Sequence, residues 1–517
     1  MNEHKFCFII CANKERFLEE CLWYIDQLPV PEGYECECRV IRDAKSMTSG
    51  YNRVMVESDA KYKIYLHQDV FILNRSLLQD LLDIFQDPVI GMVGAVGTCD
   101  FSAGADYTLI WDIGGAEVSA GTNSHYLIGE DKGEGTERLA DVVCIDGVLM
   151  ATQYDLPWEE EAFDGWDFYD ISQSVNFKQA GFRVVVPWIR TKEEIWVYHD
   201  KGRSVYDAWE RYRRVFCNKY RALGYEYRDQ GRLQRNEDLS DQRRDILKVF
   251  QAGDLEKTNE LLNCLGEDQL DLRLCYVALF ISIRQEEIAT MGEASYSKEA
   301  ELDDFIEVFD EVKHMCRRMY FSEVPAVKED AWQIIREMLY QGKITMKMVW
   351  AVVYVCVGEP NRLWGDVIGK YEEEIRSLIR QGDILKAEQL LLQLDKDKRG
   401  KTGNVLLILI GIFRKELEKN VSSTVFDVSL DANELVEHFI RVKLYLRRLE
   451  FGLPEQTWLE FYEYGRQTGV SDYMILYLLQ NNIFYKEECC RNLSGLFAKM
   501  EGADSLRARL YHGLAEK

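Results

Sequence analysis

Short apolar runs alternate with helix-like spacing over roughly the first 200 residues, and this alternation constrains the fold more than any other feature. Phe6–Cys11, Cys38–Ile41 and Ile64–Leu66 have the length and composition of strands. Between them, Arg16–Leu28 and Ser46–Ser58 carry apolar residues at three- and four-residue spacing. Strands and helices in alternation predict an α/β domain with a mainly parallel sheet, whose ligands bind beyond the carboxyl ends of the strands.

From about residue 245 to residue 517 the pattern is helical, with few strand signals. Ile246–Leu262 and Ile375–Leu391 resemble each other, and Ile335–Gly342 is a shorter third copy. In the two longer copies, Gly253-Asp254 and Gly382-Asp383 predict the end of one helix and the start of the next. Such units predict a solenoid of stacked helical hairpins, similar to tetratricopeptide repeats. An irregular helical bundle is the alternative.

A chain of 517 residues is long for one hydrophobic core. We expect an α/β domain over residues 1–235 and a helical domain over residues 245–517, joined at the polar stretch 228–244. The net charge of −25 argues against nucleic acid as a partner. Scattered cysteines, the absence of a secretory start and the absence of an apolar run of membrane-spanning length favour a cytoplasmic location.

His67 and Asp69 lie between two apolar runs of strand character, Ile64–Leu66 and Val70–Ile72. An ionised carboxylate in a buried strand is costly unless it is paired or binds a metal. On an extended chain, two residues that are two positions apart point to the same side, and both of these residue types bind metals. The alternative is a strand that ends at the surface, with Asp69 as a loop cap.

Asn13 and Asp43 follow the first and second predicted strands, just as Asp69 follows the third. Because the carboxyl ends of parallel strands meet at one edge of a sheet, we expect these three side chains at the same edge. This shared placement favours a ligand role for Asp69 over a cap.

A second acidic cluster, Asp164-Gly-Trp-Asp-Phe-Tyr-Asp170, directly precedes a helical pattern. Asp167, with Asp170 three residues on, fits a helix N-cap, and spacing alone favours that interpretation. A carboxylate beside Trp166 at a helix start also suits a general base. Desolvation by the indole would raise its pKa, and the helix N-terminus would lower it.

His199 closes the aromatic-rich run Ile195–His199 and is followed by Asp200. Among the 7 histidines, only His67 and His199 combine a predicted strand end with a neighbouring aspartate. A single histidine at a strand end is more often a polar residue with satisfied hydrogen bonds. Two such sites in one domain favour metal binding.

Four segments occur in a fixed order along the chain: Ser46–Asn52, Tyr65–Val70, Ile145–Met150 and Phe163–Asp170. Together they resemble bacterial glycosyltransferases of the family 2 type, and within these the capsule-type subgroup that includes the StrF-like proteins. The resemblance covers roughly residues 4–220 and nothing beyond about residue 245. It implies a GT-A (nucleotide-diphospho-sugar transferase-like) fold, a nucleotide-sugar donor with UDP-sugar expected, and a divalent cation, Mn²⁺ or Mg²⁺.

Carried over by position, the resemblance implies that Asp69 binds the metal and that His199 completes its coordination. It implies that Asp167 is the base, with Asp164 as a second catalytic carboxylate. His67 departs from the family pattern, since it stands where the first acid of the Asp-x-Asp motif usually lies. Donor-binding positions implied in this way are Asn13, Asp43, Asn52, His67 and Asp146.

We therefore expect an inverting, metal-dependent glycosyltransferase that transfers a sugar to a hydroxyl of a glycan, lipid-linked or protein acceptor. Bacterial surface polysaccharide or glycoconjugate synthesis is the expected setting. The helical domain would bind acceptor, a protein partner or a second copy. The alternative is an inactive, transferase-like scaffold with a partner-binding helical domain, which the histidine at position 67 supports. A nucleotidyltransferase is less well supported, because no glycine-rich, basic phosphate loop is present.

Overall fold

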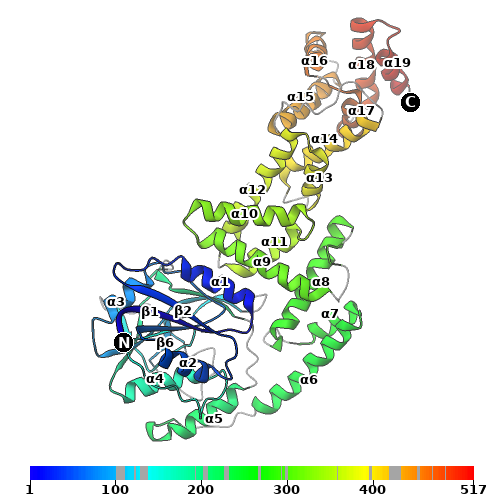
Figure 1. The fold of residues 1–517 in the computed structure, drawn as a ribbon. Coiled ribbons are helices and arrows are strands. Elements are labelled where there is room, and N and C mark those ends of the chain that lie inside the picture. The colour runs from blue at the N-terminus through cyan, green and yellow to red at the C-terminus, as the bar shows by residue number, and fades with distance from the viewer. Residues whose placement is uncertain are drawn as a thin grey trace. The chain divides into compact units, whose positions relative to one another are not determined.

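The structure is a computed structural model of the chain, shown in Figure 1. It describes residues 1–99, 111–120, 124–128, 138–191, 194–201, 208–225, 232–265, 269–292, 294–296, 301–357, 359–394, 399–418, 432–450, 455–468, 470–483 and 485–516. The chain forms two compact units. Unit 1 comprises Met1–Arg284, Tyr296–Ile344 and Met348–Leu363, and unit 2 comprises Gln285–Ser295, Thr345–Lys347 and Trp364–Lys517. The domain boundaries proposed from the sequence stay a prediction.

Unit 1 contains a seven-stranded sheet with the strand order β10-β13-β5-β12-β3-β1-β2. Its strands are β1 (Asn2–Cys11), β2 (Glu35–Ile41), β3 (Ala60–His67), β5 (Ile90–Gly94), β10 (Leu139–Asp141), β12 (Leu149–Thr152) and β13 (Arg183–Pro187). β1 lies between β2 and β3 and is parallel to both. The carboxyl ends of these three strands therefore meet at one edge, which is where Asn13, Asp43 and Asp69 follow them.

The sheet is mixed: β1, β2, β3, β5 and β13 run in one direction, in line with the predicted mainly parallel sheet, whereas β10 and β12 run in the other. β12 is antiparallel to both of its neighbours, β3 and β5, and β10 is antiparallel to β13. Leu149, the first residue of β12, pairs with Leu66 near the carboxyl end of β3. The chain thus enters β12 at the carboxyl edge and runs away from it. Apolar patterning gives the period of a strand but not its direction, so this feature was invisible in the sequence.

Two small sheets flank the large one. One contains β6 (Val96–Thr98), β7 (Ile113–Gly114) and β11 (Cys144–Ile145), and the other contains β4 (Val70–Ile72), β8 (Ala116–Ala120), β9 (Ser124–Ile128) and β14 (Val197–Lys201). In the four-stranded sheet, β14 lies between β4 and β8. β4 follows β3 after two residues, so this sheet continues directly from the strand that carries His67.

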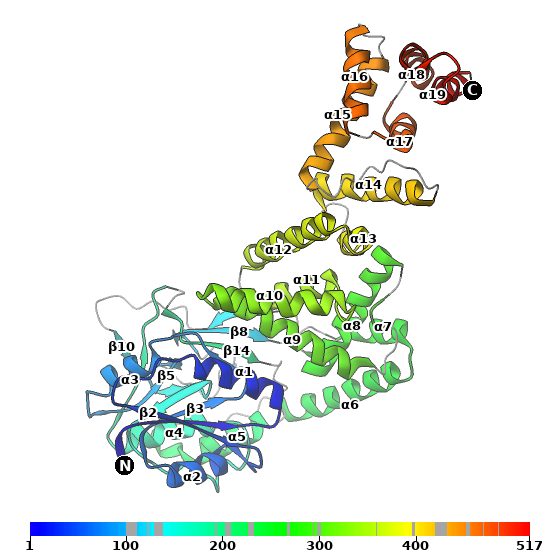
Figure 2. The same cartoon turned by 45° about the horizontal axis from the view of Figure 1, so that its top comes forward.

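Helices cover both faces of the large sheet, as Figure 2 shows for α1 and α2. The helices of this domain are α1 (Glu15–Asp26), α2 (Met47–Glu57), α3 (Leu77–Ile84), α4 (Tyr169–Gln179) and α5 (Trp209–Lys219). Alternate residues of β1 enter different cores. Phe6 and Phe8 pack with α1 and α3, whereas Cys7 and Ile9 pack with α2. This period of two is the physical reason why the β1 run is apolar throughout.

The rest of the described chain is helical. Its helices are α6 (Arg232–Gln251), α7 (Leu255–Asn263), α8 (Leu272–Met291), α9 (Leu302–Phe321), α10 (Pro325–Tyr340), α11 (Met346–Cys356), α12 (Pro360–Gln381), α13 (Ile384–Leu392), α14 (Gly400–Glu418), α15 (Ala432–Glu450), α16 (Glu455–Thr468), α17 (Asp472–Asn482), α18 (Lys486–Glu501) and α19 (Leu506–Ala515). Residues 232–244 of the predicted joint belong to α6, so most of that polar stretch is a helix rather than a linker. No described helix has the length and apolarity needed to cross a membrane.

The helix ends predicted from the two longer sequence copies are confirmed. Gly253 and Gly382 have φ angles of 80° or slightly more, a conformation that favours glycine after a helix. Asp254 and Asp383 then cap the next helix, each accepting from the backbone amide three residues on, at 2.9 Å and 3.4 Å. Gly342 of the short copy also has a positive φ. Whether these units stack as a solenoid stays a prediction.

Candidate metal and catalytic site

His67, Asp69 and His199 come together at the carboxyl end of β3, where one ligand atom from each lies within 4.8 Å of the others. The Nε2 atom of His199 is 3.5 Å from Oδ1 of Asp69. Antiparallel pairing of β14 with β4 places His199 opposite Val70, and the backbone N–H of Asp200 donates to the carbonyl oxygen of Asp69 at 2.9 Å. The sequence had placed His199 at the end of a strand. In the structure His199 lies inside β14 instead.

The donor set fits a divalent transition-metal ion. Imidazole nitrogens suit Mn²⁺, Fe²⁺ or Zn²⁺, whereas Mg²⁺ prefers oxygen ligands. Ligand atoms about 2.1 Å from one ion lie roughly 3 to 4 Å apart, and the 3.5 Å between His199 and Asp69 falls in this range. Burial opposes ionisation of Asp69, but the nearby imidazoles of His199 and His67 outweigh it and lower the pKa of this carboxyl. Asp69 is thus a carboxylate, the form that binds metal.

Tyr169, the first residue of α4, holds His67 by a hydrogen bond between its hydroxyl and Nε2 of the imidazole. Tyr169 is buried against Gly147, where an added Cβ would lie only 1.9 Å from the tyrosine hydroxyl oxygen. When one ring nitrogen of a histidine is engaged by the protein in this way, the other nitrogen is oriented for a metal. The contact fixes the imidazole of His67, whose ligand atom lies within 4.8 Å of those of Asp69 and His199; these three residues are called the candidate metal group.

Asp170 lies beside the predicted donor-binding residue Asp146. Its carboxylate accepts the backbone N–H groups of Gly147 and Ile171, both at 2.8 Å. Burial, together with the negative charge of Asp146, raises the pKa of Asp170 to about 7 despite these hydrogen bonds. Asp146 is half-buried and accepts the N–H of Val148 at 2.9 Å. Asp146 and Asp170 therefore both adjoin Gly147, the residue against which Tyr169 packs.

Asp167 does not cap α4, so the N-cap interpretation of the sequence was wrong. The residue at the cap position is Phe168, which makes no side-chain capping bond. Phe168 has a φ of 64°, the one positive φ outside glycine in the described part of the chain. Such a backbone costs about 1–3 kcal/mol and persists where packing enforces it. Here the buried Phe168 ring contacts Trp209 and Phe216, with centroids 5.3 and 5.5 Å away.

Asp164 and Trp166 occupy the exposed part of the same loop. The Asp164 carboxylate accepts the Tyr212 hydroxyl at 2.8 Å and the Arg211 guanidinium at 3.0 Å. The Tyr212 hydrogen bond, aided by the Arg211 charge, lowers the pKa of Asp164 below its ordinary value. Asp167 is half-buried, and Trp166, which lies between the two acids in the sequence, is 52% exposed.

Helix α2 fixes this loop from the other side. Ser46 caps α2 in a capping box, which typically stabilises a helix by about 1 kcal/mol. The Thr48 hydroxyl donates to the carbonyl of Phe163 at 2.7 Å, and the N–H of Met47 donates to that of Gly165 at 3.0 Å. Ser46–Asn52 and Phe163–Asp170, the first and last of the four segments that carry the family resemblance, are therefore in direct contact.

Two more of the predicted donor-binding residues, Asn52 and Asp43, are bonded to other residues of the protein. Asn52 exchanges two hydrogen bonds with the backbone of Trp158, at 2.8 and 3.0 Å. Asp43 is exposed and pairs with Arg53 at 2.7 Å. These contacts tie α2 to its surroundings, so the donor contacts of both residues stay predictions.

Asn13 is joined to the segment His67–Asp69 by Gln68, the residue between the two candidate ligands. The Gln68 amide accepts the backbone N–H of Asn13 at 2.9 Å and donates to its side-chain oxygen at 2.7 Å. Sequence reasoning missed Gln68, Tyr169 and Asp170 as parts of the site. All three lie inside the resembling segments, which was the available signal.

The comparisons with known proteins agree with the fold. Residues 7–220 match the model of a family described as a glycosyltransferase-like family. This range contains every site residue predicted from the sequence. With the mixed α/β sheet, the match confirms the predicted fold class, a GT-A-like N-terminal domain followed by many helices. It supports a glycosyltransferase domain of the family 2 type.

Solved structures with some similarity include three chains. Staphylococcus aureus TarS 1–349 is 9% identical over 69% of this chain and 91% of that chain, with a TM-score of 0.29. GalNAc-T7 with UDP, GalNAc and Mn²⁺ is 10% identical over 46% and 54%, with a TM-score of 0.29. Mannosyltransferase PcManGT from Pyrobaculum calidifontis, in complex with GDP-Man and Mn²⁺, is 11% identical over 55% and 88%, with a TM-score of 0.25. No curated protein matches this sequence.

Proposed function

We propose that this chain is an inverting, metal-dependent glycosyltransferase that moves a sugar from a nucleotide-sugar donor to an acceptor hydroxyl. The observation that carries the proposal is the group His67, Asp69 and His199 at the carboxyl edge of the sheet, inside the range that matches the glycosyltransferase-like family. Ligands of α/β sheets bind at this edge. A cation there would neutralise the negative charge that the leaving diphosphate gains during nucleotide-sugar transfer.

His67, Asp69 and His199 would hold the cation, and Mn²⁺ fits their two imidazoles and one carboxylate better than Mg²⁺. When bound, a divalent cation neutralises the charge of the nucleoside diphosphate as a Lewis acid. Asn13, Asp43 and Asp146 remain the proposed donor contacts, with a UDP-sugar as the proposed donor.

Asp167 is the proposed general base. It is half-buried and follows the exposed Trp166, and the strained backbone of Phe168 fixes the turn beside it. Asp164 is the weaker candidate, because its ion pair and hydrogen bond keep it ionised and engaged. A single base that deprotonates the acceptor hydroxyl supports direct displacement, which inverts the anomeric centre.

The exposed indole of Trp166 supports a saccharide acceptor. Its loop is pinned by Met47, Thr48 and Tyr212, so the ring is presented from a fixed backbone. An indole held in this way offers a flat apolar face beside the base, suited to the apolar face of a sugar ring. This is consistent with a role in polysaccharide or glycoconjugate synthesis.

Calorimetry with UDP-, GDP-, CMP- and dTDP-sugars, with and without Mn²⁺, tests the proposal. We expect one donor class to bind only with Mn²⁺ and to stabilise the protein by about 2.7 kcal/mol at 100 times its dissociation constant. Asp69→Asn should lose this binding. Asp167→Asn should keep it but lose about 10²–10⁴-fold in kcat, with Asp164→Asn less affected. Absence of Mn²⁺-dependent donor binding in the unmodified protein would favour the inactive scaffold instead.

A further inference from the structure

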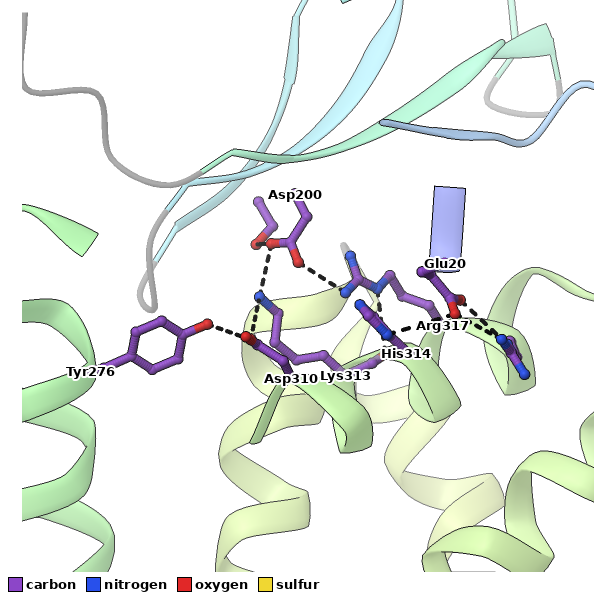
Figure 3. A network of polar contacts seen from close by, with 9 residues as sticks. Glu20, Asp200, Tyr276, Asp310, Lys313, His314 and Arg317 are labelled. Atoms are coloured by element: carbon purple, nitrogen blue, oxygen red, sulfur yellow. Dashed lines mark hydrogen bonds and ion pairs between the residues drawn. The ribbon is translucent and has the colours of Figure 1, made fainter. Parts of the chain in front are cut away.

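Helix α9 reaches the strand that carries His199 through a buried ion-pair network, shown in Figure 3. Lys313 donates to Oδ1 of Asp200 at 2.8 Å, and Arg317 donates to Oδ2 at 2.9 Å. Asp200 directly follows His199 in β14. Both oxygens of its carboxylate are therefore bonded to α9, and all three side chains are buried.

The network continues away from the strand. Asp310, one turn before Lys313 on α9, lies 3.8 Å from the lysine ammonium and accepts the hydroxyl of Tyr276. The two cations of α9 are thus balanced by two buried carboxylates, one on the helix and one on β14. This balance is what allows four ionisable groups to remain in the interior.

Arg317 also contacts β4, the strand that follows Asp69. Its guanidinium lies over the ring of Phe71 in β4, at 4.6 Å, and over the ring of Tyr198 in β14, at 5.0 Å. Phe71 and Tyr198 are paired across the two strands. The same helix therefore touches the strand that follows Asp69 and the strand that contains His199.

We propose that Lys313 and Arg317 are positioning residues for the metal group. Through Asp200 they set the place of His199, and through the hydrogen bond from the Asp200 N–H to the Asp69 carbonyl they set the place of Asp69. This inference rests on the metal-dependent function proposed above. It makes α9, which lies outside the range matching the glycosyltransferase-like family, a required part of the metal site.

Two physical arguments favour a role of Lys313 and Arg317 in positioning Asp200 over a role in merely attaching α9 to the domain. A hydrophobic contact would attach a helix at least as well, because buried ion pairs bring little net stability. Two charge-assisted hydrogen bonds to one carboxylate, in contrast, fix both its position and its rotation. Residues that orient metal ligands in this way typically change metal affinity by about 10–100-fold when removed.

The same helix offers a matched control. Arg318, next to Arg317, bonds to Glu20 of α1 at 2.7 Å and lies over the ring of Trp23 at 4.2 Å. These contacts attach α9 to α1 rather than to β4 or β14. Removal of Arg318 therefore tests attachment alone.

Mn²⁺ affinity of the full-length chain, measured by electron paramagnetic resonance of free Mn²⁺, tests the proposal without any assay of activity. We expect Lys313→Met and Asp200→Asn to bind Mn²⁺ about 10–100-fold more weakly. Lys313→Arg, which keeps the charge, and Arg318→Gln should bind near the wild-type affinity. Circular dichroism verifies the fold of each variant. If Lys313→Met does not fold, Asp200→Asn decides, since it keeps the shape and an acceptor oxygen.

Wild-type Mn²⁺ affinity in folded Lys313→Met or Asp200→Asn would overturn the positioning role. An equal loss in Arg318→Gln would do so as well, because α9 would then act as general support. If the unmodified protein does not bind Mn²⁺, the proposed function fails instead, so the two failures are distinguishable.

Discussion

The hydroxyl of Tyr169 is hydrogen-bonded to Nε2 of His67, which joins the start of α4 to the end of β3. The two residues are separated by 102 positions in the sequence. Because Tyr169 follows the proposed base Asp167 by two residues, this one contact connects the metal group with the loop that carries the base. It gives the first of four predictions.

Tyr169→Phe should weaken Mn²⁺ binding about 10–100-fold, because His67 loses the partner that orients its ring. Tyr51→Phe is the control. Tyr51 is also buried, and its hydroxyl has no hydrogen-bond partner among the described residues. Its loss should leave both Mn²⁺ affinity and the free energy of unfolding near the wild-type values. Calorimetric titration of both variants with Mn²⁺ checks this, and equal affinities would refute the role of Tyr169.

Gly147→Ala should destabilise the protein by about 1–3 kcal/mol and weaken Mn²⁺ binding, since the new Cβ would overlap the Tyr169 hydroxyl. Gly165→Ala is the matched comparison, because its Cβ would lie 2.3 Å from the hydroxyl of Tyr212, which does not bond to His67. Denaturant unfolding should show a loss in both variants. Mn²⁺ titration should separate them, and a similar affinity loss in both would contradict a specific effect through Tyr169.

The unfolding free energy should depend on pH through Asp170. Burial and the negative charge of Asp146 raise the pKa of Asp170 to about 7, whereas an unfolded aspartate titrates near about 4. The folded state therefore binds more protons between these values, so this group makes stability fall as pH rises through about 4 to 7.

Asp146→Asn removes the negative charge that helps to raise the pKa of Asp170. The difference in unfolding free energy, variant minus wild type, should therefore be more positive at pH 8 than at pH 5, by about 1 kcal/mol. Asp141→Asn is the control of opposite sign. The hydrogen bond from Arg183 lowers the pKa of Asp141, so its loss should bring no gain at pH 8. Urea unfolding at the two pH values checks both, and a pH-independent effect of Asp146→Asn would contradict the coupling.

The helix caps that begin α7 and α13 should respond unequally to alanine. Asp254 accepts its capping N–H at 2.9 Å and Asp383 at 3.4 Å. Replacement of an aspartate cap typically costs about 1 kcal/mol, and we expect the larger cost for Asp254→Ala. Hydrogen exchange of the amides in the first turn of each helix measures this locally. Faster exchange in α13 than in α7 after the respective substitutions would contradict the prediction.

Local chemistry made parts of this fold readable from the sequence. The apolar runs that became β1 and β3 were recognisable because a strand buried on both faces needs apolar side chains throughout. The glycine–aspartate pairs at 253–254 and 382–383 were recognisable because a positive φ and a capping carboxylate depend on neighbouring residues alone. Asp69 was singled out because an ionised carboxylate between two apolar strand runs is costly unless it is paired or binds a metal. His199 was singled out because, like His67, it combines a predicted strand end with a neighbouring aspartate.

Other features depended on contacts between distant segments. The direction of β12 is set by where the chain enters the sheet, which the period of two does not encode. The cap at Asp167 was wrong because packing of Phe168 against Trp209 and Phe216 enforces a left-handed turn that local propensity disfavours.

The sequence by itself determined the residue types of the candidate metal group, the strand and helix periods and the caps at Asp254 and Asp383, since each follows from chemistry within a few residues. Only the tertiary structure showed that ligand atoms of His67, Asp69 and His199 lie within 4.8 Å of one another, that Tyr169 bonds to His67, and that α9 reaches Asp200. The physical reason is that hydrogen bonds and ion pairs form between atoms close in space. Here the partners are separated by more than 100 positions along the chain.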